Sequence, residues 1–243
     1  NSIASGGNYN VTVGDEAGTA ITTGDANVAI GYQALIANTE ASYITGVGYQ
    51  ALKLNTTGTA NVALGADALR QNLTGAANVA VGNNALVLNT GSNNTAVGKD
   101  AGTAVTSGTG NSYIGANAGD GSDDGANNVA LGFLALSANH GNNNVAVGEG
   151  AMIAGTGGTN TVVGSAAGGN ASFAGSGNTL LGRSAGTGIS SGSNNVVIGN
   201  GCDVNSAAQD NGICIGVGIV AAANDFSFGK ASNVVTCDFD ADA

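Results

Sequence analysis

The chain has 243 residues, of which 42% are hydrophobic and only 9% are charged, and its formal net charge is −11. Five Lys and Arg residues stand against sixteen Asp and Glu residues, which excludes nucleic-acid binding through a basic patch. No apolar run is long enough for a transmembrane helix, so we expect no membrane insertion. A soluble domain typically carries about 25% charged residues. The low charge predicts that other chains cover much of the surface.

A pentapeptide of the form Asn-Val-Ala-Ile-Gly recurs at a nearly constant interval along the whole chain. The period is about 17 residues, and no interval between closing glycines departs from it by more than a single position. A period this constant predicts one structural unit, or coil, that is stacked many times. The closing glycines are Gly14, Gly31, Gly48, Gly65, Gly82, Gly98, Gly115, Gly132, Gly148, Gly164, Gly182, Gly199 and Gly216.

The residues before each glycine predict a short strand. An apolar residue precedes the glycine, a Val often stands two residues earlier, and a small residue, usually Ala, lies between them. A period of two places the outer pair on one face and the small residue on the other. We predict that the pair forms the core and that the small residues form close faces between chains. The predicted core residues are Val28, Ile30, Val62, Leu64, Val79, Val81, Val129, Leu131, Val145 and Val147.

Asparagine and the residues after the glycine predict the rest of each coil. An Asn four residues before the glycine favours a turn and, when stacked in register, a ladder of side chains. Three residues after the glycine stands Ala. It is followed either by Leu-x-x-Asn, as in Leu35 to Asn38, or by a second glycine, as in Gly18. The first pattern predicts a short second strand or tight helical turn, and the second predicts a looser loop.

These features predict an all-β, repetitive β-solenoid in which each coil corresponds to one repeat of about 17 residues. The sequence contains no Pro, so every backbone N–H is able to join the ladder of hydrogen bonds. A lone coil buries too little apolar surface to offset the entropy of ordering its backbone. We therefore expect a parallel homo-oligomer, and a trimer in particular, because three flat faces close around one axis.

The segment from Asn27 to Ala34 resembles the head repeats of trimeric autotransporter adhesins. The segments Gly31 to Leu35 and Gly48 to Leu52 are also similar to repeats in phage tail fibres. The resemblance covers about residues 10 to 220 and implies a left-handed parallel β-roll with three chains side by side. On this basis residues 1–216 form a β-roll shaft, and residues 217–243 form a divergent C-terminal cap.

The C-terminal segment from Phe226 to Ala243 departs from the repeat and becomes aromatic and acidic. It is similar to the segment that precedes the self-cleaving chaperone domain of phage tail fibres and spikes, and a mature end at Ala243 would fit such a cut. The resulting hypothesis is a non-enzymatic trimeric fibre shaft on a virion, outside the cell, that attaches to a host receptor, expected to be a glycan. The alternatives are the head of a secreted bacterial surface adhesin and an extracellular structural filament. The loops at 120–127 and 172–177 are the expected lateral contacts.

Three other functions would each require residues in a particular arrangement. A hexapeptide acyltransferase would need two further hexads in each coil and a catalytic histidine, whereas His140 is predicted in a surface turn. A polysaccharide-degrading tailspike would need paired carboxylates, which are scattered here. An ice-binding surface would need a regular array of threonines, and Thr57, Thr74 and Thr90 instead lie in turns beside glycines. We therefore predict no enzyme and no cofactor.

The remaining candidate sites are an acidic loop and the three cysteines. Asp120, Asp123 and Asp124 lie among glycines and form a weak Ca²⁺ candidate without the spacing of an EF-hand; the alternative is a solvated loop. Cys202 and Cys214 are predicted as small buried residues. Cys237 is a candidate for an interchain bond in an extracellular oligomer.

Overall fold

The computed structural model describes residues 7–121, 124–169 and 173–238. In these ranges the protein is all-β, with no helix, and forms a parallel β-solenoid of about 13 coils with a spacing of about 17 residues, as predicted. The chain divides into two compact units, Asn1–Asn127 and Asn128–Ala243. Each coil is named below after the glycine that follows its strand.

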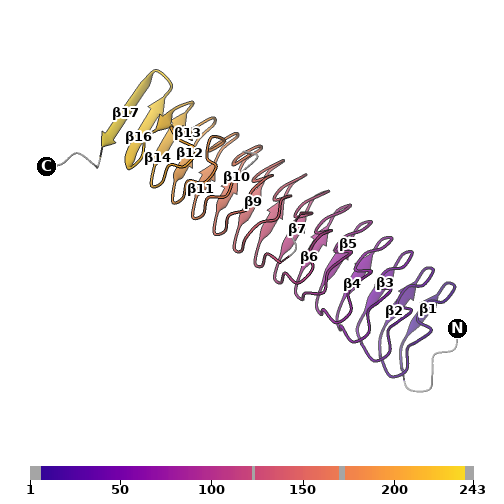
Figure 1. Ribbon diagram of the computed structural model, residues 1–243. Coiled ribbons are helices and arrows are strands. Elements are labelled where there is room, and N and C mark those ends of the chain that lie inside the picture. The colour runs from indigo at the N-terminus through magenta and orange to yellow at the C-terminus, as the bar shows by residue number, and fades with distance from the viewer. Residues whose placement is uncertain (1–6, 122–123, 170–172, 239–243) are drawn as a thin grey trace. The chain divides into compact units, whose positions relative to one another are not determined.

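The N-terminal unit holds seven strands that pair in chain order, each parallel to the next (Figure 1). Equivalent positions of the repeat lie opposite one another, so that Val62 pairs with Val79 and Leu64 pairs with Val81. The strands are β1 (Val11–Val13), β2 (Val28–Ile30), β3 (Thr45–Val47), β4 (Val62–Leu64), β5 (Val79–Val81), β6 (Thr95–Val97) and β7 (Ser112–Ile114).

The C-terminal unit continues with the same strand pattern and ends in a hairpin. Strands β8 to β12, β14 and β16 pair in parallel, β17 runs antiparallel to β16, and β13 and β15 form a separate two-stranded sheet. The strands are β8 (Val129–Leu131), β9 (Val145–Val147), β10 (Thr161–Val163), β11 (Thr179–Leu181), β12 (Val196–Ile198), β13 (Asp203–Val204), β14 (Ile213–Val217), β15 (Val220–Ala221), β16 (Asp225–Lys230) and β17 (Asn233–Asp238).

The closing glycine turns the chain out of each strand with a backbone that other residues rarely adopt. Gly65 has a φ of 142°, and a Cβ atom at this position would lie 2.5 Å from the carbonyl oxygen of Gly82 in the next coil. Stacked coils therefore leave no room for a side chain at the closing position. This close approach explains why glycine recurs there.

The segment after the glycine is a turn in which alternate residues are left-handed, and both predictions about its conformation were wrong. It is neither a second strand nor a helical turn, because Gln33 and Leu35 have φ values of 55° and 53°. The Ala-Gly coils are not looser either, since Gly102 adopts the same conformation with a φ of 61°. The two kinds of coil share one backbone and differ in which side chain fills its interior.

The predicted core was assigned to the wrong face of the strands. None of the ten predicted core residues is buried in the single chain, whereas the alanines between them, such as Ala63 and Ala80, have no exposed surface. The coil is narrow: a Cβ atom added at the inward position Gly46 would lie 3.4 Å from the side chain of Leu35. The small residue therefore faces inward, where it packs against the Ala and Leu that follow the glycine.

Ala-Gly coils accommodate larger inward residues. Tyr113 occupies the inward position of β7 and is fully buried. A Cβ atom at Gly102 or Gly119 would come within 3.0 Å or 2.5 Å of its ring. The second glycine thus makes the space that Tyr113 fills, in place of the usual pair of Ala and Leu.

The predicted asparagine ladder is confirmed. The side chain of Asn78 accepts a hydrogen bond from the backbone N–H of Asn94, 2.9 Å away, and donates one to the carbonyl of Gly91 at 2.9 Å. From Asn27 onward the Asn residues of this ladder are buried in both units, so each side chain satisfies backbone groups inside the coil. The ladder bonds run from Asn10 to Asn27, from Asn61 through Asn78 and Asn94 to Asn111, and from Asn128 through Asn144, Asn160 and Asn178 to Asn195.

The first strand of the C-terminal hairpin continues the register of the coils, although its sequence departs from the repeat interval. Phe226 pairs with Ile213, Phe228 pairs with Ile215, and Gly229 lies opposite Gly216 with a φ of 139°. The strand β16 therefore continues the register of the coils, although Gly229 follows Gly216 at less than the usual interval. The stacking of parallel strands ends only at β17, which turns back along β16.

Candidate functional site

The outward face of the strands is apolar in both units. The outward residues of β1 to β12 are Val, Ile, Leu, Thr or Ser, and none is charged. Several large side chains on this face are well exposed, among them Leu64 and Ile114 in the N-terminal unit and Leu131 and Leu181 in the C-terminal unit. An exposed apolar surface that repeats over many coils is typical of an interface between chains.

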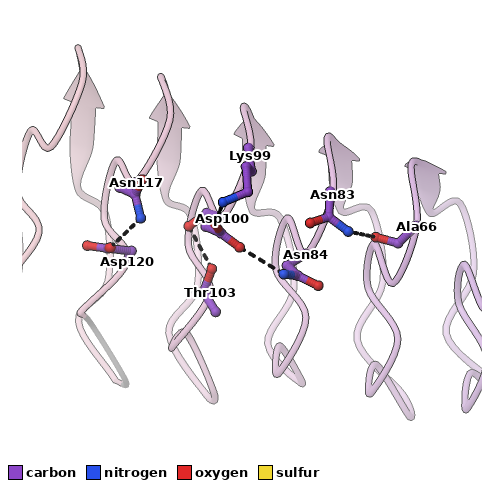
Figure 2. A network of polar contacts seen from close by, with 8 residues as sticks. All are labelled: Ala66, Asn83, Asn84, Lys99, Asp100, Thr103, Asn117 and Asp120. Carbon is purple, nitrogen blue, oxygen red and sulfur yellow. Dashed lines mark hydrogen bonds and ion pairs between the residues drawn. The ribbon is translucent and has the colours of Figure 1, made fainter.

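A second surface of the N-terminal unit is a ridge formed by the turns after the closing glycines. We define the ridge by the first, second and fifth residues after each glycine. The second and fifth residues of one coil interact, as Asn117 and Asp120 do at 3.0 Å and as Thr103 does with the carbonyl of Asp100 at 2.6 Å (Figure 2). The ridge therefore places side chains from neighbouring coils in rows along the unit.

Charges in one part of the ridge are matched within the chain. Asp100 pairs with Lys99 at 2.7 Å and accepts a hydrogen bond from Asn84 at 2.8 Å (Figure 2). The hydrogen bond from Lys99 and then that from Asn84 lower the pKa of the Asp100 carboxyl. Lys99 is thus engaged with a carboxylate of its own coil.

The ridge also carries two stacked tyrosines. Tyr32 and Tyr49 take the first place after the glycine in successive coils, and their ring centroids lie 5.6 Å apart with the planes 22° from parallel. Their exposed fractions are 41% and 51%. Partial desolvation, and next the charge of Glu16, raise the pKa of the Tyr32 phenol.

Amide side chains run beside the tyrosines. Gln33 donates a hydrogen bond to Glu16 at 2.5 Å, and Gln50 donates one to Gln33 at 2.9 Å. The row ends at Gln50 because the next coil has Asp67 at this place. Hydrogen bonds between neighbouring coils therefore hold the side chains of Glu16, Gln33 and Gln50 in one row.

Two cations lie next along the same ridge. Lys53 and Arg70 take the fifth place after the glycine in successive coils and, with Leu54 and Gln71, line a shallow pocket. The Nε of Arg70 lies 3.6 Å from a carboxylate oxygen of Asp67, which orients the guanidinium. A guanidinium has five N–H donors, so one ion pair leaves several of them for other partners.

The weak calcium candidate is tested only in part. Asp120 accepts a hydrogen bond from Asn117, and burial raises the pKa of its carboxyl. Asp124 is exposed, and Asp123 lies outside the described residues. Within the described ranges, no three His, Cys, Asp or Glu side chains are grouped so that they could hold a metal ion. Calcium binding at this loop stays a prediction. The lateral contacts at 120–127 and 172–177 also stay predictions, and residues 122, 123 and 172 of these loops lie outside the described residues.

The placement of His140 in a surface turn was wrong. Its side chain is 2% exposed, and its Nδ1 lies 3.2 Å from the carbonyl oxygen of Gly141. In other coils the turn asparagine bonds this carbonyl, as Asn55 does to Gly58 at 3.0 Å. His140 takes this role in its coil, and the neighbouring Asn139 is exposed instead. Coil length does not explain the exchange, because the equally short Gly82 coil keeps Asn89 buried and bonded to the carbonyl of Gly91 at 2.9 Å. Burial lowers the pKa of His140 to about 4.

The cysteines lie near the end of the C-terminal unit. Cys202 and Cys214 are buried, as predicted, and Cys237 is exposed. The Sγ of Cys202 donates to the carbonyl of Gly216 at 2.9 Å. Burial, together with the neighbouring Cys202, raises the pKa of the Cys214 thiol to about 12, so this buried sulfur acts as a small core group.

The fold and these two surfaces define a class of protein, the parallel β-solenoid that presents repeated side chains along its coils. Comparisons with models of known families, with curated proteins and with solved structures find no match to this chain. A search of the described residues finds no helix that is both long and apolar enough to cross a membrane. The surfaces themselves are therefore the basis for a functional proposal.

Proposed function

We propose that the protein is a non-enzymatic fibrous attachment protein, and that its chains assemble side by side through the outward faces of their strands. The proposal rests on the uncharged apolar rows of that face, which a single chain leaves in contact with water. Burying such rows against equivalent rows of other chains would remove apolar area from water in every coil.

A parallel trimer is the assembly that we favour. Parallel chains bring identical coils to the same height, so rows of equal period meet along their whole length. Three such faces close around an axis and leave no apolar row exposed, whereas an open arrangement would continue to add chains. The turn ridges of the three chains would then face outward, as an attachment surface requires.

The resemblance to adhesin heads and tail-fibre repeats supports a place outside the cell, on a virion or a cell surface. In this setting the solenoid acts as a shaft, and its ridge or its loops contact a host receptor. A phage fibre is the form that we favour, because the aromatic and acidic segment that begins at Phe226 is similar to the segment before a fibre chaperone domain.

The decisive experiment is the absolute mass of the purified chain, measured by light scattering on a sizing column with and without reductant. We expect three times the 23.0 kDa of one chain under both conditions. A monomer whose circular dichroism spectrum shows folded β-structure would overturn the assembly. A mass that grows with concentration would indicate an end-to-end filament instead. A trimer seen only without reductant would assign the assembly to the exposed Cys237 rather than to the apolar face.

A further inference from the structure

Aromatic, amide and cationic side chains come together on the ridge of the Gly31, Gly48 and Gly65 coils. Tyr32 and Tyr49 are stacked and exposed, and Ala66 takes the same place in the coil that follows. Because alanine carries only a methyl group, no third ring continues the stack beyond Tyr49. The far side of this ring is open to a flat apolar partner.

The polar groups beside the rings are held in place before any ligand arrives. Gln50 is nearly buried and is bonded to Gln33, so little side-chain entropy would be lost when its amide contacts a ligand. The C–H face of a pyranose stacks on an aromatic ring, and its hydroxyls bind amide and carboxylate groups. A fixed amide row beside an exposed ring therefore fits a sugar better than it fits a purely apolar molecule.

The two cations indicate that the ligand carries a negative charge. Lys53 and Arg70 are two of only five Lys and Arg residues in the chain, yet they occupy one place in adjacent coils and line one pocket. The Nε of Arg70 lies 3.6 Å from the carboxylate of Asp67. This contact is longer than the 2.7 Å between Lys99 and Asp100 further along the ridge (Figure 2). An anionic group placed between Lys53 and Arg70 would gain charge-assisted hydrogen bonds.

We propose that this part of the ridge binds an acidic saccharide, with a sugar ring against Tyr32 and Tyr49, hydroxyls on Gln33 and Gln50, and a carboxylate on Lys53 and Arg70. The inference deepens the proposed function, on which it rests, because it names the class of receptor that the fibre would contact. A net charge of −11 repels polyanions in general. Binding of an acidic glycan would therefore require a local site of this kind.

The test is a calorimetric titration of the intact chain with hexamers of galacturonate, and in parallel with maltohexaose and inorganic sulfate. We expect saturable binding of the uronate hexamer that weakens as salt increases, and weaker binding of the neutral hexamer. Sulfate that binds as well as the hexamer would reduce the site to an anion pocket and overturn the role of the tyrosines. No heat with uronate at millimolar concentration would overturn the proposal.

Paired variants separate the two halves of the site. Tyr49→Ala should weaken uronate binding on the order of tenfold, and the double variant Lys53→Gln and Arg70→Gln should abolish this binding. Phe133→Ala and Lys99→Gln are matched controls, because Phe133 takes the place of Tyr49 in the Gly132 coil and Lys99 is already paired. Equal losses in the controls would overturn the site.

The mass of each variant separates this proposal from the previous one. If Tyr49→Ala dissociates the oligomer, the tyrosines form a contact between chains and the saccharide site is wrong. If the unaltered chain is monomeric yet binds uronate through Tyr49 and Arg70, the site stands and the trimer fails.

Discussion

The inward and outward faces of the same strands have opposite packing requirements. In β5 the inward Ala80 is fully buried, whereas Val79 and Val81 on the outward face keep contact with solvent. The smaller side chain lies inside because the turns approach it closely, as Leu35 and Ala51 approach Gly46, and the larger ones lie outside because there is no room for them within. The difference teaches that folding of the chain depends on the inward residues, whereas the proposed assembly depends on the outward ones, so we expect that each can be changed without the other.

The largest effect is expected from enlarging the inward face. Ala80→Leu would press three more carbons against Leu69 and Leu86, which are buried on the opposite wall. We expect a loss of more than about 3 kcal/mol in the free energy of unfolding, or no folding at room temperature. Val81→Leu on the outward face of the same strand should change this free energy by less than about 0.5 kcal/mol. Chemical denaturation followed by circular dichroism measures both.

A compensating change sharpens this prediction. Tyr113 fits its inward position because Gly102 and Gly119 flank it. Replacing Leu69 by Gly in the Ala80→Leu chain should therefore recover part of the lost stability. If the double variant is less stable than Ala80→Leu alone, the narrow coil is not the reason why alanine lies inside.

The asparagine ladder should give the second largest effect. Asn78→Ala would leave the N–H of Asn94 without its side-chain acceptor and would remove one of the two side-chain hydrogen bonds that the carbonyl of Gly91 accepts, the other coming from Asn89. We expect a loss of about 2–3 kcal/mol. The control Asn83→Ala removes one exposed hydrogen bond to Ala66 and should cost less than about 0.5 kcal/mol (Figure 2). Equal melting temperatures for the two variants would refute a structural role for the ladder.

The sequence determined the strands of this fold but not their orientation. The pentapeptide placed each of the strands β1 to β12 correctly, because its closing glycine marks where a strand ends. Alternation of Val and Ala shows that a strand has two faces, yet it does not say which one is inside. That depends on the width of the coil, which is set by the approach of Leu35 and its equivalents across the coil.

Other features of the fold could not be predicted from a constant repeat length. His140 lies inward in place of Asn139, although the equally short Gly82 coil keeps Asn89 buried, and Gly229 aligns with Gly216 although the interval between them is shorter than the repeat. The stacking of Tyr32 on Tyr49, by contrast, follows from their separation by one full repeat and could have been read from the sequence. The cationic pocket needed the structure, which showed Lys53 and Arg70 lining one hollow.

A smaller effect should appear when the pH is lowered, because His140 is an ionisable group on the inside of the coil. Its folded pKa is about 4, below the ordinary value of 6.5, so between these values the unfolded chain binds a proton that the folded chain does not. Stability therefore falls as the pH drops from 6.5 towards 4, by about 1.4 kcal/mol at pH 5.5. His140→Asn should abolish this component, and the difference between the two denaturation series at pH 7.5 and 5.5 measures it. Parallel pH curves for both chains would contradict a neutral buried imidazole.

The smallest effect on chain stability, with a large effect on assembly, is expected on the outward face. The double variant Leu64→Lys and Val81→Lys places two cations where adjacent strands are apolar, and neither side chain is needed inside the coil. We expect an unchanged circular dichroism spectrum, and a mass by light scattering that falls from three chains to one, because unpaired charges would have to be buried between chains. Asn83→Lys, on the ridge, is the matched control and should remain trimeric, since the ridge is expected to face solvent. If the double variant keeps the mass of the unaltered oligomer, the chains associate through another face and the outward rows lose their proposed role.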